Sequence, residues 1–536
     1  MKKATDLKLE LLGVIPRYKS GKIELSPQEV AAFSGLLTFR GSSVSKLVKE
    51  ARIKKQDIKK KIKLILRKSA LRGHASMATM PVFSFSFEGS KMIGSMITGI
   101  TFSSALMHSG RRAEVSVKDN VCPTGIFSKK KAYKIYEEAA NGNVNAFNQM
   151  LKLGAVRDEA SKILHYGTYG TGVLSFPAES LVTFSHEYEL EREWMPEEAG
   201  MLIELLEKKM KKMGIDFLYA TRSVAPRNTY AYPNLFKDPG EGNLARDLAQ
   251  ANKLDKDMTK IVSFESYLGQ GFKKRVLEFI KIRKGIVRDN KTLKKRWPEL
   301  LGLRRKLIRD YGTGLNISFL SRVSWRVWRD KKRHRTAPVV TESIYYCASR
   351  ASRVIGCHRK DWERRGDLSV EAIEEINRVL AVPPVLRQDQ KLRQIYLKAC
   401  FDSFLAYERM LELGIEPRDA IFVIPRAIRI DMIQQYNLHN LIEGYYPLRS
   451  CVTADEQILR QTREEIRQIK KLFSARGLGY LNNLIEPKCT GSGFCPEEKT
   501  CGYIKGMVKG YNDKGHGEMK DDLEQRFLDK LKRLGK

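Results

Sequence analysis

Two arginines and a histidine stand side by side at Arg333, His334 and Arg335, and seven residues separate them from Ser343. An arginine fork binds a phosphate through two hydrogen bonds at once, and an imidazole changes its charge close to neutral pH. The tripeptide therefore fits a phosphate clamp. In a basic chain it also fits a nucleic-acid patch or a solvated charged face, and these residues alone do not decide between the three.

The composition narrows the range of partners. The chain has 536 residues, enough for two domains and a tail, and 97 Lys and Arg against 62 Asp and Glu give a formal charge of +35. Such a charge favours anionic partners: nucleotides, nucleic acid or acidic lipid. The N-terminal stretch has no long apolar segment of the signal-peptide kind, and eight cysteines without a secretory start predict a reducing, cytoplasmic environment.

The uncharged stretch 92–110 is long enough to cross a bilayer. However, it is rich in serine, threonine and glycine and contains a histidine, a composition unsuited to a lipid-facing helix. We therefore predict a helix of small residues that is buried within a soluble protein, and no membrane partner.

The chain contains an internal repeat. The stretches 135–154 and 395–414 share Ile, Tyr, two Ala, Met, two Leu and Gly at the same places without a gap. Each has the apolar spacing of an amphipathic helix and a Gly at its end. A constant offset over this length indicates two copies of one domain. We place copy one at 1–235, a linker at 236–254, copy two at 255–485 and a basic, Cys-containing tail at 486–536.

The remaining patterns suggest the fold class. In copy one, Phe83, Phe85 and Phe87 alternate with small residues and predict a strand over 81–89. In copy two, the charged segment 284–310 has no clean apolar period and predicts a solvated pair of helices. Helices combined with alternating strands, without a regular βαβ order, predict an α+β fold.

The order of the motifs resembles that of one family. Copy one has Gly-His-x-Ser at 73–76, the Phe-rich strand, and then Ser-x-Arg at 109–111. Copy two has Arg-His-Arg, seven residues and Ser343, followed by a segment over 419–449 that ends in Leu-Arg. This arrangement is similar to the flavin-dependent thymidylate synthases (ThyX), and the resemblance spans nearly the whole chain as two diverged copies. It implies an antiparallel or mixed sheet flanked by helices in each copy.

The two copies have lost different halves of the family signature. Copy one has Gly99, Ile100 and Thr101 in place of Arg-His-Arg but keeps Ser-x-Arg, whereas copy two has Tyr345 in place of the final Arg. In this family the active sites lie between the subunits of a homotetramer. The resemblance therefore implies sites composed from both copies, and a homodimer of this chain that forms a pseudo-tetramer.

The resemblance also implies a reaction, the reductive methylation of dUMP to dTMP with FAD, methylenetetrahydrofolate and NADPH. Arg333 and Arg111 would clamp the nucleotide phosphate, Arg449 would face the uracil, and Ser109 or Ser343 would bond near the pyrimidine. The residues that would hold the flavin are His74, Ser76, His334, Arg335, Asn437 and His439.

Several residues depart from the family pattern. Ser161 and Ile421 stand where an Arg on the nucleotide is expected, and Asp330 stands where a Gln often contacts the substrate. A carboxylate there repels a phosphate unless it pairs with Lys331 or Arg333. These departures leave two alternatives open: a degenerate paralogue that binds nucleotide or flavin without turnover, and a basic nucleic-acid-binding protein on the same scaffold.

The tail contains Cys489, Cys495 and Cys501, with five residues between neighbouring cysteines. Structural zinc sites use closer pairs of cysteines. We therefore predict free thiols and no metal, although His516 could add a fourth ligand.

Overall fold

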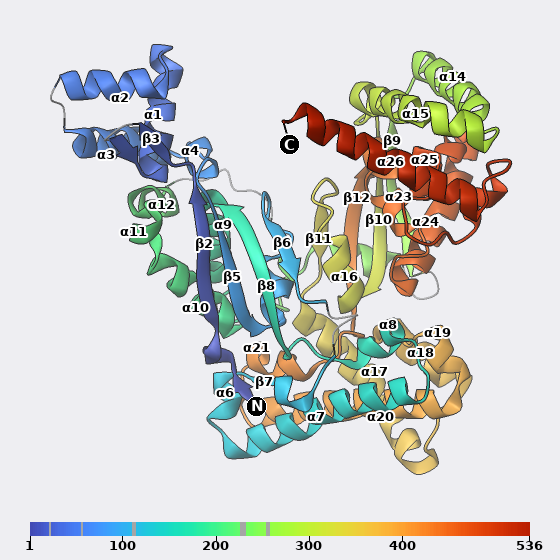
Figure 1. Cartoon of the computed structure of the whole chain (residues 1–536). Coiled ribbons are helices and arrows are strands. Elements are labelled where there is room, and N and C mark those ends of the chain that lie inside the picture. The colour runs from blue at the N-terminus through green and yellow to red at the C-terminus, as the bar shows by residue number, and fades with distance from the viewer. Residues whose placement is uncertain are drawn as a thin grey trace. The chain divides into compact units, whose positions relative to one another are not determined.

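The computed structural model describes residues 1–20, 23–54, 57–109, 114–225, 232–252, 254 and 258–535 (Figure 1). The chain divides into two compact units. Unit 1 comprises Met1–Gly242, Ser324–Arg333 and Thr341–Ile430, and unit 2 comprises Asn243–Val323, His334–Val340 and Asp431–Lys536. The first boundary falls within the predicted linker 236–254. The units are not the two sequence copies, because unit 1 includes long segments of copy two.

The first sheet has four strands in the order β2-β5-β8-β6. They are β2 (Lys8–Ile15), β5 (Val82–Ser90), β8 (Tyr169–Pro177) and β6 (Ser104–Met107), and neighbouring strands are antiparallel. β5 confirms the predicted strand: Phe83, Phe85 and Phe87 are buried, and the first two pack edge-on against the ring of Phe176 on β8.

The second sheet repeats this arrangement, with the order β9-β10-β12-β11. Its strands are β9 (Thr259–Ser266), β10 (Leu315–Ser324), β12 (Arg429–Asn437) and β11 (Val339–Thr341). β9 pairs antiparallel with β10, as β2 does with β5. Helices together with largely antiparallel sheets confirm the α+β class.

A run of elements recurs at a constant spacing along the chain. Helix α7 (Lys130–Lys152) corresponds to α20 (Gln390–Glu412), each of 23 residues, and both confirm the predicted amphipathic helices. After each helix come a glycine with positive φ, a four-residue helix and a three-residue 3-10 turn. The helices are α8 (Arg157–Ala160) and α21 (Pro417–Ala420), and the turns are η4 (Ser161–Ile163) and η5 (Ile421–Val423). The run then ends in β8 and β12.

Within unit 1, equivalent residues of this run touch each other. α7 packs along α20, and the Ser403 hydroxyl donates to Asn143 Oδ1 at 2.9 Å. An isolated bridge joins His165 to Pro425. Contact between equivalent residues is what a two-fold axis produces at a dimer interface. The geometry therefore supports an internal duplication, while the limits assigned to each copy remain predictions.

The prediction of one helix over 92–110 is wrong. Helix α5 spans only Met92–Ile97, and the chain then turns through Gly99 and Phe102, both with positive φ, into strand β6. The helix is fully buried, as predicted. No helix among the described residues is long and apolar enough to span a membrane.

The charged segment of copy two does form a helix pair, but the pair is not simply solvated. The helices are α14 (Gln270–Ile286) and α15 (Asn290–Tyr311). Leu293, Trp297 and Leu300 on α15 are buried in a cluster with residues of the tail. The helical spacing of these apolar residues was not visible in the sequence because arginines and lysines stand between them.

The remaining helices divide between the two units. In unit 1 they are α1 (Pro27–Arg40), α2 (Val44–Ile53), α3 (Ile58–Lys68), α4 (Ser76–Thr79), α6 (Thr124–Phe127), α9 (Ala178–Leu190), α10 (Glu197–Glu207), α11 (Met210–Met213), α12 (Asp216–Ser223), α16 (Trp325–Lys331), α17 (Ile344–Arg365), α18 (Val370–Val379) and α19 (Pro384–Gln388). In unit 2 they are α13 (Leu244–Ala251), α22 (Leu438–Ile442), α23 (Tyr445–Arg449), α24 (Glu456–Ala475), α25 (Lys488–Ser492) and α26 (Asp513–Arg533).

Candidate functional site

Helix α16 carries Arg326 and Arg329 about one turn apart, and Arg333 follows in the turn just after the helix ends. Ser324 caps the helix by accepting a hydrogen bond from the Val327 amide at 3.2 Å. The first amides of the helix donate to the backbone oxygens of Ile428 and Arg426, at 2.8 and 3.1 Å. The helix therefore starts on the segment that carries Arg426.

Two arginines, one on α16 and one before β12, lie against the same buried ring. The guanidinium groups of Arg329 and Arg426 lie 4.5 and 4.7 Å from the ring centre of Tyr166. Arg426 donates to the His165 carbonyl at 3.0 Å and to Thr168 Oγ1 at 3.3 Å. Gly94 on α5 makes room for Arg329, because any β-carbon at position 94 would collide with its guanidinium.

Lys91 completes this group, which we call the cation cluster (Lys91, Arg329, Arg333 and Arg426). Burial, and then repulsion from Arg426 and Arg329, lowers the pKa of Lys91 to about 7. Burial also lowers the pKa of Arg426 to about 9 and that of Arg333 to about 10, with repulsion from Arg329 acting in the same direction. Each cation therefore makes the charge of the others more costly.

The cluster has unused hydrogen-bonding groups. Arg329 Nε and the Tyr166 hydroxyl are buried and have no hydrogen-bond partner among the described residues. The Lys91 ammonium likewise makes no hydrogen bond or ion pair there, and only 4% of this residue is exposed. Buried charges without counter-charges cost several kcal/mol each, so the arrangement favours an anion.

Asp330 forms an ion pair within α16. Its carboxylate lies 3.1 Å from Arg326, one helical turn away. Its charge also acts on Arg333, where it opposes the lowering of the pKa by burial.

In unit 2, two predicted residues come together. Arg449 Nε donates to His334 Nε2 at 3.0 Å, and the imidazole packs edge-on against Tyr445, with ring centres 4.9 Å apart. An imidazole nitrogen that accepts from a guanidinium carries no proton, so this contact favours neutral His334. Arg335 is exposed.

A polar network of amides lies in the same unit. Asn437 caps helix α22 by accepting from the Asn440 amide at 3.1 Å. The Asn440 side chain donates to the Thr336 carbonyl at 3.1 Å and accepts from the Thr336 hydroxyl at 3.0 Å. His439 is half-buried, and its carbonyl accepts from the amides of Glu443 and Gly444.

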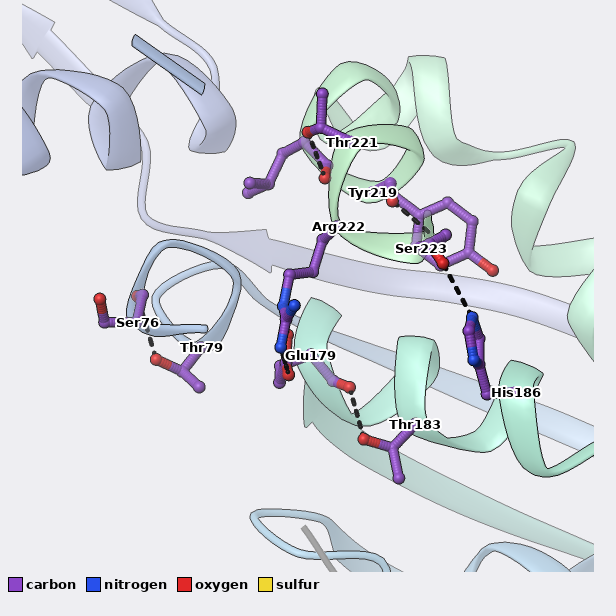
Figure 2. Close-up of polar contacts among 10 residues, drawn as sticks. Ser76, Thr79, Glu179, Thr183, His186, Tyr219, Thr221, Arg222 and Ser223 are labelled. Atoms are coloured by element: carbon purple, nitrogen blue, oxygen red, sulfur yellow. Dashed lines mark hydrogen bonds and ion pairs between the residues drawn. The ribbon is translucent and has the colours of Figure 1, made fainter. Parts of the chain in front are cut away.

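The predicted flavin residues of copy one, His74 and Ser76, are exposed at the start of α4. Figure 2 shows their surroundings: Ser76 lies on the turn with Thr79, and beyond it Arg222 of α12 points at Glu179 of α9. This pair is fully buried, with two hydrogen bonds of 2.8 Å. Glu179 corresponds by the repeat to His439, so this position has become a structural ion pair in copy one.

The serine positions of the two copies differ in their surroundings. Ser343 is fully buried, caps α17, and donates to the Lys237 carbonyl at 2.7 Å. Tyr345 is also buried, and its hydroxyl donates to the Trp194 carbonyl. Ser109 is half-buried, and Arg111 lies outside the described residues. The roles assigned to these residues remain predictions.

Sequence reasoning missed Lys91, Tyr166, Arg329 and Arg426. The spacing of Arg326 and Arg329 was a visible signal, since residues three apart share a helix face. Lys91 and Arg426 gave none, because each is a single cation beside an apolar run.

In the tail, His516 is held by the Tyr511 hydroxyl at 3.0 Å and by the Glu497 carbonyl at 3.0 Å. Both ring nitrogens are thus engaged with protein atoms. No group of three or more His, Cys, Asp or Glu side chains in the described ranges is arranged around a single ion position.

Residues 314–473 match the model of the family described as thymidylate synthase complementing protein, Thy1. A flavin-dependent thymidylate synthase from Pyrococcus abyssi is 27% identical over 126 residues, 24% of this chain and 51% of that protein. The enzyme of that name from Geobacter sulfurreducens is 31% identical over 129 residues, 23% of this chain and 50% of that protein. This part of the chain is therefore similar to the Thy1 family and to proteins named flavin-dependent thymidylate synthases.

The chain spans about half the length of the curated relatives it matches. Among solved structures, a UMP/dUMP methylase PolB from Streptomyces cacaoi, bound with 5-Br dUMP, aligns over 42% of this chain and 100% of its own. The identity is 13% and the TM-score 0.33, too low to support an inference. The matched region lies in copy two, and the resemblance of copy one remains a prediction.

Proposed function

We propose that this protein is a flavin-dependent thymidylate synthase, which methylates dUMP to dTMP using methylenetetrahydrofolate as carbon donor and NADPH as reductant. The observation that carries the proposal is the buried cation cluster of unit 1. The Thy1 match of residues 314–473 supports the reaction class. The departures from the family pattern put a binding site for the nucleotide phosphate in doubt, and the cation cluster offers such a site.

The cation cluster suits a phosphate in charge and in chemistry. Arg329 and Arg333 offer guanidinium donors, Lys91 offers a point charge, and the Tyr166 hydroxyl is an unused donor. A dianionic phosphate would offset their mutual repulsion and satisfy buried donors. These residues would take over from the arginines that positions 161 and 421 lack.

In the proposed reaction, Arg449 donates to a uracil oxygen and polarises the ring. His334 orients Arg449 in the ligand-free protein through the 3.0 Å hydrogen bond. Tyr445 fixes the plane of the imidazole. These residues act by holding charge and orientation, which is how most enzymes lower a barrier without forming a bond themselves.

FAD would be held by His74, Ser76, His334, Arg335, Asn437 and His439. The exposed side chains of His74 and Ser76 make no side-chain hydrogen bond within the described part, so they can bind the cofactor. When bound, the flavin would carry the hydride of the reaction. Asn437 is partly committed to its helix cap, which orients its amide.

The test is a turnover assay with purified full-length protein, dUMP, FAD, methylenetetrahydrofolate and NADPH. We expect dTMP to form, and its formation to require each of the four additions. Protein that binds dUMP and FAD but forms no dTMP would contradict the proposal.

That result would instead favour a binding protein without turnover. One observation supports this alternative: Tyr345, where the family has Arg, is buried and bonded to Trp194. Equilibrium dialysis with labelled dUMP separates the alternative from a protein that binds no nucleotide.

A further inference from the structure

Three helices near the start of unit 1 form a small bundle. Helix α1 packs against both α2 and α3, and the three lie together (Figure 1). Three residues separate α1 from α2, and four separate α2 from α3. Two helices joined by a turn of about this length, and held by a third helix, are the arrangement of helix-turn-helix DNA-binding domains. In such domains the last of these helices enters the major groove, and α3 holds that position in the chain order.

The apolar side of α3 is buried within the protein. Ile62 and Leu66 are 4% and 0% exposed, and α3 contacts α12 as well as α1. Phe33 of α1 and Val48 of α2 are also fully buried. A basic amphipathic helix can instead bind a membrane surface, but it must then insert its apolar side among the lipids. The apolar side of α3 already packs against protein, so α3 has only its polar side to offer to a partner.

The exposed side of α3 carries positive charge over its whole length. Its exposed cations are Lys59, Lys60, Lys63, Arg67 and Lys68. Residues three and four apart share a helix face, so these side chains form one continuous surface. Helix α3 contains no acidic residue. Over residues 44–68, which include α2, the sequence has eleven Lys and Arg against one Asp and one Glu.

The charges of α3 are not balanced within the protein, unlike those of other basic helices. On α15, for example, Arg296 lies 2.9 Å from Glu299 and is neutralised by it. None of the exposed cations of α3 forms an ion pair with a residue that the structure describes. Like charges one turn apart on a helix repel each other. A polyanion bound along this surface would relieve that repulsion at several positions at once.

We propose that α1, α2 and α3 form a DNA-binding domain, in which the exposed side of α3 lies in the major groove of duplex DNA. Helix α3 has 11 residues, which makes it about 16 Å long. The major groove of B-DNA, about 12 Å wide, admits one such helix. Its lysines and arginine would contact the phosphates that line the groove, and such contacts give affinity with little dependence on sequence.

One apolar side chain supports contact with the bases. Leu64 is 52% exposed although it lies among the cations of α3. In the major groove, an apolar side chain can contact the methyl group of thymine. Duplex RNA offers no such site, because its major groove is too deep and narrow for side chains to reach the bases. This proposal is separate from the activity proposed above, since none of the residues assigned to dUMP lies on α1, α2 or α3.

The first experiment measures the binding of the full-length chain to a short, fluorescently labelled DNA duplex of mixed sequence by anisotropy. We expect a dissociation constant of about 1–100 μM at physiological salt, and an affinity that falls steeply as salt is added. An RNA duplex of the same sequence should bind more weakly. Tighter binding to the RNA duplex would overturn the proposal. Binding to phosphatidylserine vesicles without any binding to DNA at low salt would do the same.

The second experiment compares two triple variants that each remove three exposed positive charges. The α3 variant combines Lys60→Gln, Arg67→Gln and Lys68→Gln, and the control on α14 combines Lys274→Gln, Lys281→Gln and Lys284→Gln. The α3 variant should bind DNA at least tenfold more weakly, with a salt dependence reduced by about three phosphate contacts. The control should bind as the wild type does. An equal loss in both variants would show that net charge, and not α3, holds the DNA.

A competition experiment needs only the wild-type chain and therefore holds even if a variant fails to fold. Methyl green, which occupies the major groove, should displace the protein from DNA, whereas netropsin, which occupies the minor groove, should not. The opposite result would contradict the placement of α3. Saturating dUMP should leave DNA binding unchanged, whether or not the protein turns dUMP over. Displacement of DNA by dUMP would place the DNA at the cation cluster and overturn the proposal.

Discussion

At the scale of single residues, the cation cluster is the feature that most affects chemistry. Arg329 and Arg426 lie at the ring of Tyr166, and both repel Lys91. Asp330, which acts on Arg333, is paired with Arg326. Stable proteins avoid this arrangement unless an anion is bound for part of the working cycle, because uncompensated charge destabilises the fold. The substitutions below measure that cost directly.

Replacing Arg329 with Gln should weaken dUMP binding by about ten- to a hundredfold, the usual effect of removing one charged hydrogen-bond donor. Isothermal titration calorimetry measures the affinity. Arg359→Gln, on α17 and paired with Glu408, is the matched control and should bind as the wild-type chain does. Binding of inorganic phosphate tests the anion site independently of the reaction. If the wild type binds phosphate, Arg329→Gln does not, and the wild type turns over no dUMP, the anion site would stand and the proposed activity would be rejected.

The low pKa of Lys91 makes a pH-dependent prediction. Above pH 7 the dUMP phosphate stays dianionic, while Lys91, with a pKa of about 7, loses its proton. The affinity for dUMP should therefore fall as the pH rises from 7 to 9, and less steeply in Lys91→Met. Arg426, Arg329 and Asp119 are the charged groups that act on Lys91. An identical pH profile in both proteins would place Lys91 outside the site.

The low pKa of Lys91 also predicts how the stability of the ligand-free protein changes with pH. Its folded pKa of about 7 lies below the ordinary 10.5, so between these values the unfolded chain binds more protons than the folded chain. Stability should consequently rise with pH across this window. Denaturant unfolding at pH 7 and pH 9.5 measures the rise, and Lys91→Met should reduce it. A rise of the same size in Lys91→Met would show that other groups cause it.

A mutant cycle tests whether both copies contribute to one site. If Arg333 and Arg111 hold the same phosphate, each Ala substitution should cost on the order of a hundredfold in affinity, and the double mutant less than the sum. Strict additivity would contradict the composite site. Tyr345→Arg should not rescue Arg111→Ala, because the side chain at 345 is buried against Trp194.

At the scale of elements, helix starts position the residues that matter. Ser324 caps α16, Ser343 caps α17 and Asn437 caps α22. In a family signature, a serine or asparagine can therefore be retained for its helix cap as well as for its substrate. The structure gives Ser343 two such structural bonds.

Ser343→Ala should destabilise the protein by about 1–2 kcal/mol, because it removes a cap and leaves the Lys237 carbonyl without its donor. Urea denaturation measures the loss. Ser369→Ala, the exposed cap of α18, should cost no more than about 1 kcal/mol. A fall in turnover far beyond the loss of folded protein would assign the Ser343 hydroxyl to the substrate.

At the scale of the whole molecule, the repeat predicts the assembly. Two sheets share one strand order, and equivalent residues of α7 and α20 meet within unit 1. The family resemblance implies that one chain supplies within itself a pairing that single-copy chains make between subunits. We expect two chains to form a pseudo-tetramer, with a light-scattering mass of twice the chain. A particle of four chains would contradict this.

Many of the strands and helices of this protein were determined by local sequence. The Phe alternation of β5, the periods of α7 and α20 and their constant spacing are visible in the sequence, because strand and helix periodicity depends on neighbours a few residues apart. Corrections arose where backbone geometry or tertiary packing intervened. The positive φ at Gly99 and Phe102 ended α5 early, and packing against the tail buried one face of α15.

Only the tertiary structure decided which distant side chains share a site. Tyr166, Arg329 and Arg426 meet because α16 begins on the segment 426–428. No local period records such meetings, since they depend on packing between segments tens to hundreds of residues apart. The sequence by itself determined most of the elements and the similarity of residues 314–473 to the Thy1 family, whereas the fold determined where the charges gather.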